Sequence, residues 1–213
     1  MKRKTILLIT TVLLLLVNFA FIASSLVKKV PSSRFLPVTT NVEKKKAPSV
    51  SSARITEIRA FISNNKYSNK YCFIIDMSLP SGSNRFFVYD LKKDSIINSG
   101  LVTHGRCNER WLEGRKYNNV VGGGCTSLGK YRIGNPYYGK FGLAYKLHGL
   151  DNTNNNAFER YVVLHSHDCV PEHERDQDIC QSDGCPTVSP GYLKVLQKII
   201  DGSNKPVLLW IYG

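Results

Sequence analysis

The chain has 213 residues, enough for one ordinary domain together with a targeting segment. Its formal net charge of +13 would suit a nucleic-acid binder, but residues 1–46 hold nine Lys and Arg against one Glu, whereas the remainder holds twenty against fifteen acidic residues. The excess charge therefore lies at the N-terminus and favours an anionic membrane surface over DNA or RNA. Because the sequence also has no phosphate-binding loop, dinucleotide fingerprint or RNA-binding aromatic motif, we predict no nucleic-acid partner.

The first 29 residues resemble an export signal. The basic start "MKRK" precedes an apolar run at residues 6–27, which is longer than a cleavable signal needs and long enough to cross a bilayer. We expect residues 1–29 to be a signal anchor in the inner membrane. The small residues Ala23–Ser25 leave cleavage open. In either case the rest of the chain is expected on the extracytoplasmic face, in the cell envelope.

Residues 30–52 are rich in basic residues, Pro and Ser and are predicted to be a linker, and residues 53–213 are predicted to form the folded domain. The domain opens with a helix near 51–65, because Ile55, Ile58 and Ile62 recur at helical spacing behind a serine cap. A second helix is expected at 190–202. Strands are predicted at 71–79, 85–91, 96–105, 130–134, 144–150, 160–168 and 206–213. Short strands separated by Gly- and Asn-rich turns predict a mainly β fold, a sandwich or partly closed barrel with a few peripheral helices.

Six cysteines are present, at positions 72, 107, 125, 169, 180 and 185. In an oxidising compartment cysteines pair by default, although the sequence does not fix which ones. The local pairs Cys107–Cys125 and Cys169–Cys180 each bracket one loop and are our prediction. Cys72 falls in a strongly apolar strand and is expected to be a buried thiol. Three bridges that use all six cysteines remain the alternative.

A metal site is the second interpretation of the region around "HSHDC". On a strand, His165 and His167 would point to the same side, as two ligands would need to. His173 and three cysteines lie close by in sequence. However, the paired-cysteine and HExxH spacings of common zinc sites are missing. The sequence therefore favours a site without metal or cofactor.

The third interpretation is a cysteine nucleophile. In "SDGCP", Gly184 allows a close approach of the backbone to a substrate, and Pro186 fixes the turn after Cys185. A thiolate nucleophile needs a base nearby and N–H groups to hold the developing oxyanion. His165 ends the apolar strand "RYVVLH" and is expected to face Cys185 from a neighbouring strand.

Sixteen residues separate His165 from the serine of "SDGCP", and this pattern resembles that of the YkuD-type L,D-transpeptidases, most closely their murein L,D-transpeptidase catalytic-domain branch. The resemblance extends over residues 55–213. It includes "LVTHGR", "TSLGKYRIG", "YYGKFGLAYKLHGLDNTNNNAFERYVVLHS" and the closing "LLWIYG", in the same order.

The resemblance implies a cell-wall enzyme that acts on the tetrapeptide stems of peptidoglycan. Cys185 would open the bond before the terminal D-Ala as a thioester, with His165 as the base and then the acid. The Ser166 carbonyl would orient the imidazole, and the N–H groups of Gly184 and Cys185 would form the oxyanion hole. An amine acceptor gives a 3-3 type cross-link, whereas water gives an L,D-carboxypeptidase. A cross-link hydrolase or a wall-binding module without activity is the further alternative.

Four more residues are candidates for contacting the substrate: Ser182, His167, His148 and Tyr138, although the last two also fit a structural role at a strand end and a turn edge. The resemblance further implies inhibition by carbapenems and no cofactor. This sequence departs from the branch at Ser166, where the branch usually has Gly, and at Asp183, where a carboxylate facing inward would raise the pKa of the nucleophile. The acidic loop between residues 169 and 180 is also atypical.

Overall fold

The computed structural model describes residues 50–64 and 66–213, and residues 48–213 form one compact unit. The predicted signal anchor at residues 1–29 lies outside the described residues, as does the predicted linker up to residue 49. In the part of the chain that is described, no helix combines the length and the hydrophobicity needed to span a bilayer.

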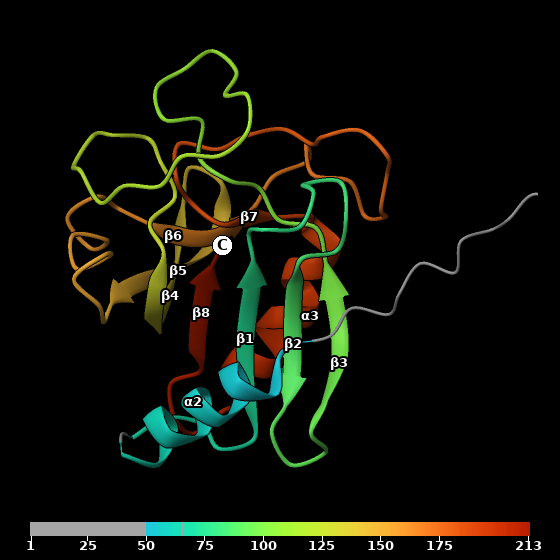
Figure 1. Cartoon of the computed structure of the whole chain (residues 1–213), viewed down its shortest axis with the longest axis vertical. Coiled ribbons are helices and arrows are strands. Elements are labelled where there is room, and N and C mark those ends of the chain that lie inside the picture. Colours follow the sequence, from blue (N-terminus) through green and yellow to red (C-terminus); the bar gives the residue numbers. More distant parts are fainter. Residues whose placement is uncertain (1–49, 65) are drawn as a thin grey trace, which may run out of the picture. The chain divides into compact units, whose positions relative to one another are not determined.

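The domain is mainly β, which confirms the predicted fold class. Eight strands form a single mixed sheet that does not close, in the order β3-β2-β1-β8-β4-β5-β6-β7 (Figure 1). Only the pairs β1–β8 and β6–β7 are parallel. The elements are α2 (Ser52–Ser63), β1 (Tyr71–Asp76), β2 (Phe86–Asp90), β3 (Ser95–Gly100), β4 (Gly129–Gly139), β5 (Gly142–Gly149), β6 (Val163–Ser166), β7 (Thr187–Val188), α3 (Pro190–Asp201) and β8 (Leu208–Tyr212).

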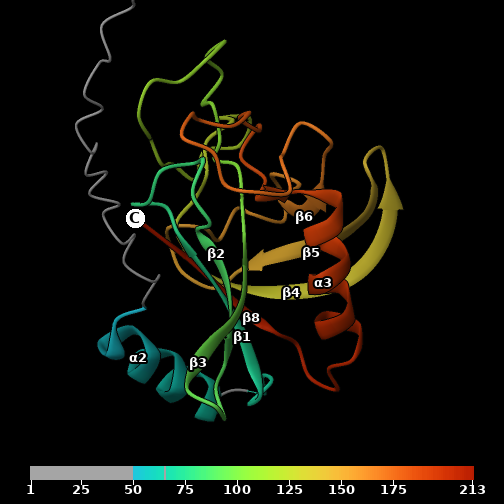
Figure 2. The ribbon, with the colours of Figure 1, turned by 90° about the vertical axis from the view of Figure 1, so that its right-hand side faces the viewer.

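The centre of the sheet is buried on both faces, with one helix on each. Alternate residues of a strand point to opposite faces, so Phe73 and Ile75 of β1 join the core under α3, while Cys72 and Ile74 join the core under α2. Figure 2 shows the two helices on opposite sides of β1, β2 and β3. Burial on both faces explains why β1 is a continuous apolar run without polar alternation.

Both predicted helices are confirmed, and their caps explain where they begin. The Ser51 hydroxyl accepts a hydrogen bond from the Arg54 N–H, and Ser189 does the same for Tyr192 at the start of α3. Such caps satisfy backbone donors that have no partner within the helix.

Several strand boundaries differ from the sequence prediction: the strand predicted at 71–79 ends at Asp76, and the one predicted at 96–105 ends at Gly100. The predicted strand 160–168 contracts to β6, because the residues before Val162 form consecutive turns. The strand predicted at 130–134 extends to Gly139 past a bulge near Pro136 and forms a long hairpin with β5. The two-residue strand β7 was not predicted, because its partners, β6 and Val102, lie far from it in sequence.

Candidate active site

The pairing of β6 with β7 brings the two predicted catalytic residues together. His165 of β6 lies opposite Thr187 of β7, two residues after Cys185. As a result, Cys185 sits in the turn that leads into β7, and both Cys185 and His165 line one cavity of about 390 Å³. The parallel pairing of β6 and β7 at the end of the sheet thus brings together a histidine and a cysteine that are distant in sequence.

Gly184 makes the turn before Cys185 possible. Its φ of +105° lies where residues with side chains are strained, and a Cβ atom there would come within 2.5 Å of the Cys125 carbonyl oxygen. Ser182 braces the same turn: its hydroxyl accepts from the Gly184 N–H at 3.2 Å and donates to the Cys185 carbonyl at 2.7 Å. The Thr103 hydroxyl donates to that carbonyl as well, at 3.2 Å. Cys185 therefore lies on a turn that several hydrogen bonds hold in place.

His165 is buried and has a defined tautomer. Its Nδ1 lies 3.0 Å from the Ser166 carbonyl oxygen, which only accepts, so Nδ1 carries the proton and Nε2 is left as the basic nitrogen. Nε2 accepts a hydrogen bond from the Thr187 hydroxyl at 3.0 Å. The ring of Phe141 stacks on the imidazole with centroids 4.6 Å apart. Burial lowers the pKa of His165 below its ordinary value, which keeps the ring neutral and able to take up a proton.

The Cys185 thiol is partly buried and directed at a backbone oxygen. Its Sγ lies 3.8 Å from the Tyr161 carbonyl oxygen and donates to it. Burial raises the pKa of Cys185, while a hydrogen bond with the Val163 backbone and the charge of Arg160 oppose that rise. The thiol and the imidazole therefore each form a hydrogen bond with a different group: the thiol with the Tyr161 carbonyl, and the imidazole with the Thr187 hydroxyl.

Asp183, which departs from the family pattern, is held by an arginine. Its carboxylate pairs with Arg106 Nε at 2.7 Å, and both side chains are largely exposed. Asp183 still adds to the raised pKa of Cys185, as its position in the sequence suggested, but this contribution is smaller than that of burial.

Both predicted disulfides are present. Cys107 is bonded to Cys125 and Cys169 to Cys180, and Cys72 and Cys185 are free thiols. Cys72 is fully buried, as predicted. The disulfide between residues 169 and 180 lines the same cavity as Cys185. Two of the cysteines that a zinc site would use as thiolates are therefore bonded to each other.

Of the remaining predicted site residues, some lie in the cavity and others do not. Ser182 and His167 line it. His167 also has a local task, because its Nδ1 accepts from the Cys169 N–H at 3.1 Å. By contrast, the cavity lining does not include Tyr138, which is 82% exposed near the tip of the β4–β5 hairpin, or His148, whose ring stacks on Phe158 with centroids 5.1 Å apart.

Several cavity residues were not singled out from the sequence: Thr103, Arg106, Arg110, Trp111, Phe141, Gln181 and Thr187. Most of them come from loops and turns that are distant from Cys185 in sequence. Trp111 and Phe141 are 45% and 46% exposed. Exposed large aromatic rings at the edge of a cavity are typical of surfaces that bind a ligand, but nothing in their local sequence distinguishes them from packing residues.

Solved structures similar to this chain include three with L,D-transpeptidase names. One is an L,D-transpeptidase from Mycobacterium smegmatis, with 10% identity, a TM-score of 0.43, and coverage of 68% of this chain and 59% of that one. An L,D-transpeptidase in complex with imipenem has 10% identity, a TM-score of 0.41, and coverage of 67% and 58%. A mutant of Enterococcus faecium L,D-transpeptidase has 12% identity, a TM-score of 0.41, and coverage of 67% and 50%.

The chain thus spans less than two thirds of the length of these three structures. A search of curated proteins found no match. The family comparison is more extensive, because the model described as "L,D-transpeptidase catalytic domain" matches residues 42–212 and so covers nearly the whole described domain, including the cavity with Cys185 and His165. The chain belongs to the L,D-transpeptidase catalytic domain family.

Proposed function

We propose that this protein is a cysteine-dependent L,D-transpeptidase that acts on tetrapeptide stems of peptidoglycan. The observation that supports it best is the placement of a free thiol, Cys185, and a neutral imidazole, His165, in one cavity at the paired ends of β6 and β7. A thiol and an imidazole with one unprotonated nitrogen are the two groups that acyl transfer through a thioester requires.

In the proposed reaction, His165 Nε2 takes the thiol proton as Sγ attacks the carbonyl that precedes the terminal D-Ala. The C–N bond then breaks, and the imidazolium returns its proton to the leaving amine of D-Ala. An amine of a neighbouring stem then attacks the thioester and gives one proton to His165 Nε2. The C–S bond breaks, and the imidazolium returns that proton to Sγ, which regenerates the thiol. This sequence needs no cofactor.

Two hydrogen bonds must change before the thiol reaches its base. Sγ turns away from the Tyr161 carbonyl, and the Thr187 hydroxyl releases Nε2. Hydrogen bonds of catalytic groups are often arranged differently before the substrate binds. The proposed oxyanion hole also needs a hydrogen bond to change. The Gly184 N–H donates to Ser182 Oγ in this structure and must donate to the substrate oxygen instead.

The proposed location is the cell envelope, on the extracytoplasmic face, with residues 1–29 as the anchor. Two disulfides support an oxidising compartment. Peptidoglycan lies in the same compartment. We also propose that carbapenems acylate Cys185, since one similar structure is named as an L,D-transpeptidase in complex with imipenem.

The experiment is muropeptide mass spectrometry after incubation of the purified chain with a disaccharide-tetrapeptide. We expect release of D-Ala together with a 3-3 linked dimer, and loss of both products in Cys185→Ser. Cys72→Ala is the matched control, since it removes the other free thiol, which lies in the core under α2. Trimmed stems without dimers would indicate an L,D-carboxypeptidase instead. A folded Cys185→Ser variant that keeps its activity would contradict the proposal.

A further inference from the structure

Arg160 places a charged side chain between the loop of residues 118–127 and the turn that carries Cys185. Its Nη1 donates to the Asn118 carbonyl at 3.1 Å and to Ser127 Oγ at 3.0 Å, and its Nη2 donates to the Cys125 carbonyl. All three acceptors are uncharged. Within residues 50–64 and 66–213, no carboxylate forms an ion pair with this guanidinium. Arg160 is therefore a partly buried cation without a neutralising partner.

The guanidinium lies directly behind the peptide that precedes Cys185. A Cβ atom built on Gly184 would lie 2.5 Å from the Cys125 carbonyl oxygen and 3.2 Å from Arg160 Nη2. The carbonyl that Arg160 holds thus forms the wall against which the nucleophile turn packs. Arg160 also precedes Tyr161, whose own carbonyl accepts the Cys185 thiol.

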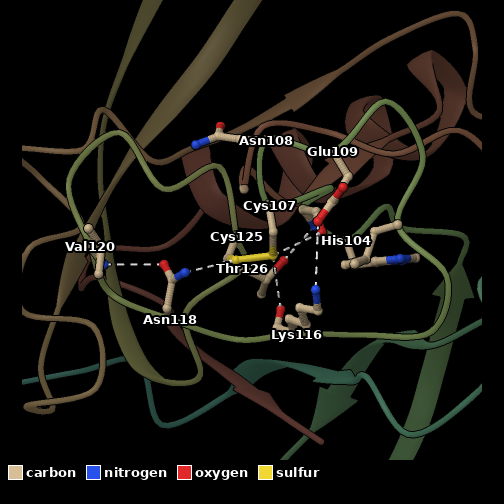
Figure 3. Close-up of a disulfide and its surroundings, with 12 residues drawn as sticks. His104, Cys107, Asn108, Glu109, Lys116, Asn118, Val120, Cys125 and Thr126 are labelled. Carbon is tan, nitrogen blue, oxygen red and sulfur yellow. Dashed lines mark hydrogen bonds and ion pairs between the residues drawn. A yellow bond between two sulfur atoms is a disulfide. The ribbon is translucent and has the colours of Figure 1, made fainter.

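A disulfide also restrains Cys125, the residue whose carbonyl packs against Gly184. Figure 3 shows Cys125 bonded to Cys107, with the Asn118 side chain donating to Cys125 Sγ at 2.9 Å. The backbone carbonyls of Asn118 and Cys125 are two of the three groups that Arg160 binds. The disulfide therefore holds in place the loop that sets the position of the guanidinium.

The charge of Arg160 complements a thiolate. Burial raises the pKa of Cys185 and lowers the pKa of Arg160, and the attraction between the two charged forms opposes both changes. The other charged or ionisable groups around the cavity are Asp183, which is paired with Arg106, and Arg110, His165 and His167, which line it. Tyr131 stays protonated because burial raises its pKa to about 12. Among the groups whose charge acts on Cys185, Arg160 is the cation, and within residues 50–64 and 66–213 no carboxylate pairs with it.

We propose that Arg160 is a positioning residue for the reaction at Cys185: it fixes the Cys125 carbonyl behind Gly184 and stabilises the thiolate once the thiol proton has moved to His165 Nε2. The inference rests on the proposed function only in taking Cys185 as the nucleophile. The guanidinium keeps its own protons throughout, so the only proton transferred is the one that passes from Sγ to the imidazole. The thiolate, rather than the thiol, is the reactive form of cysteine, and a neighbouring arginine increases its share.

The test is the pH dependence of iodoacetamide alkylation at Cys185 in the full chain, followed by mass spectrometry of its peptide. Cys72 does not interfere, because burial raises its pKa to about 12. In Arg160→Met and Arg160→Gln we expect the apparent pKa of Cys185 to rise by about one unit and alkylation at pH 7 to fall about tenfold. Arg160→Lys should restore most of the rate, because it returns the charge without all of the hydrogen bonds.

The matched control is Arg54→Met, which removes a cation that stacks on Trp210 and Tyr212, away from the cavity. It should leave the alkylation profile unchanged. Intact disulfides and a cooperative thermal transition identify folded variants, and the two uncharged replacements of different shape guard against a misfolded one. A folded uncharged variant with the parental pH profile overturns the inference, as does a lysine variant that behaves like methionine. Because alkylation needs no stem peptide, these outcomes are independent of whether the chain proves to be a transpeptidase.

Discussion

The Thr187 hydroxyl lies 3.0 Å from His165 Nε2, so the nitrogen that we propose as the base is hydrogen-bonded to a threonine and not to the nucleophile. The same hydroxyl lies 3.4 Å from the Cys185 carbonyl oxygen. Thr187 therefore has a second acceptor within reach when it releases the imidazole. Thr187 and Cys185 compete for one lone pair.

Thr187→Val is expected to increase the reactivity of Cys185 at neutral pH. Valine has nearly the same shape but cannot donate, so Nε2 becomes available to the thiol. A hydrogen bond of this kind contributes about 1 kcal/mol, which corresponds to a rise of roughly fivefold in the alkylation rate. Thr187→Ser keeps the hydroxyl and should leave the rate unchanged. The proposed competition is wrong if Thr187→Val slows alkylation while the fold is intact.

His165→Ala is expected to abolish turnover, whereas His167→Ala should reduce it much less. General-base catalysis contributes about 10²–10⁴-fold, and only His165 has its Nδ1 proton fixed by a carbonyl so that Nε2 is the basic nitrogen. His167 Nδ1 instead accepts from the backbone of Cys169. Rates of D-Ala release for the two variants decide the matter. If His167 is essential and His165 dispensable, the assignment is off by two residues.

Gly184→Ala should destabilise the domain and reduce Cys185 reactivity together. The new Cβ meets the Cys125 carbonyl at 2.5 Å in addition to the strain of a positive φ. Gly114→Ala is the matched control, since Gly114 also has a positive φ, of 70°, but nothing lies within 4 Å of its Cβ position. We expect the Gly114 variant to lose about 1 kcal/mol in thermal unfolding and the Gly184 variant more. Equal losses would show that the close approach is unimportant.

Stability should fall as the pH drops from about 6.5 towards 4. His104 is buried beside Arg85, whose Nη2 lies 3.1 Å from His104 Nδ1, and burial together with the positive charge of Arg85 lowers the pKa of His104 to about 4. Below pH 6.5 the unfolded chain binds a proton that the folded chain does not, so stability is complete above 6.5 and is lost on acidification. The full shift corresponds to about 3 kcal/mol.

The measurement is the midpoint of thermal unfolding between pH 4 and pH 8. His104→Gln has no titrating ring and should flatten the part of the curve below pH 6.5. His165 changes stability in the same direction, because burial lowers its pKa too, so some slope is expected to remain in the variant. A parental curve without any slope between pH 6.5 and 4 contradicts the prediction.

Local patterns in the sequence were sufficient for several features of this protein. A serine cap and apolar spacing placed α2, because these signals act within a few residues. Cysteines that bracket single loops predicted both disulfides, since their partners are close along the chain. Gly184 before Cys185 only suggested a nucleophile, and the resemblance to a known family, which includes the interval back to His165, singled out the two residues that share the cavity. The helix and the disulfides each depend on residues that lie close together along the chain.

The tertiary structure decided what depends on residues far apart in sequence. The two-residue strand β7 pairs with β6, which lies far from it in sequence, and that pairing places the Thr187 hydroxyl against His165 Nε2. Phe141 reaches His165 through a hairpin, and Arg160 is held by carbonyls that lie more than 30 positions earlier. Such contacts have no local signature, because an arginine or a threonine in a turn looks the same in a sequence whether it faces water or a buried thiol.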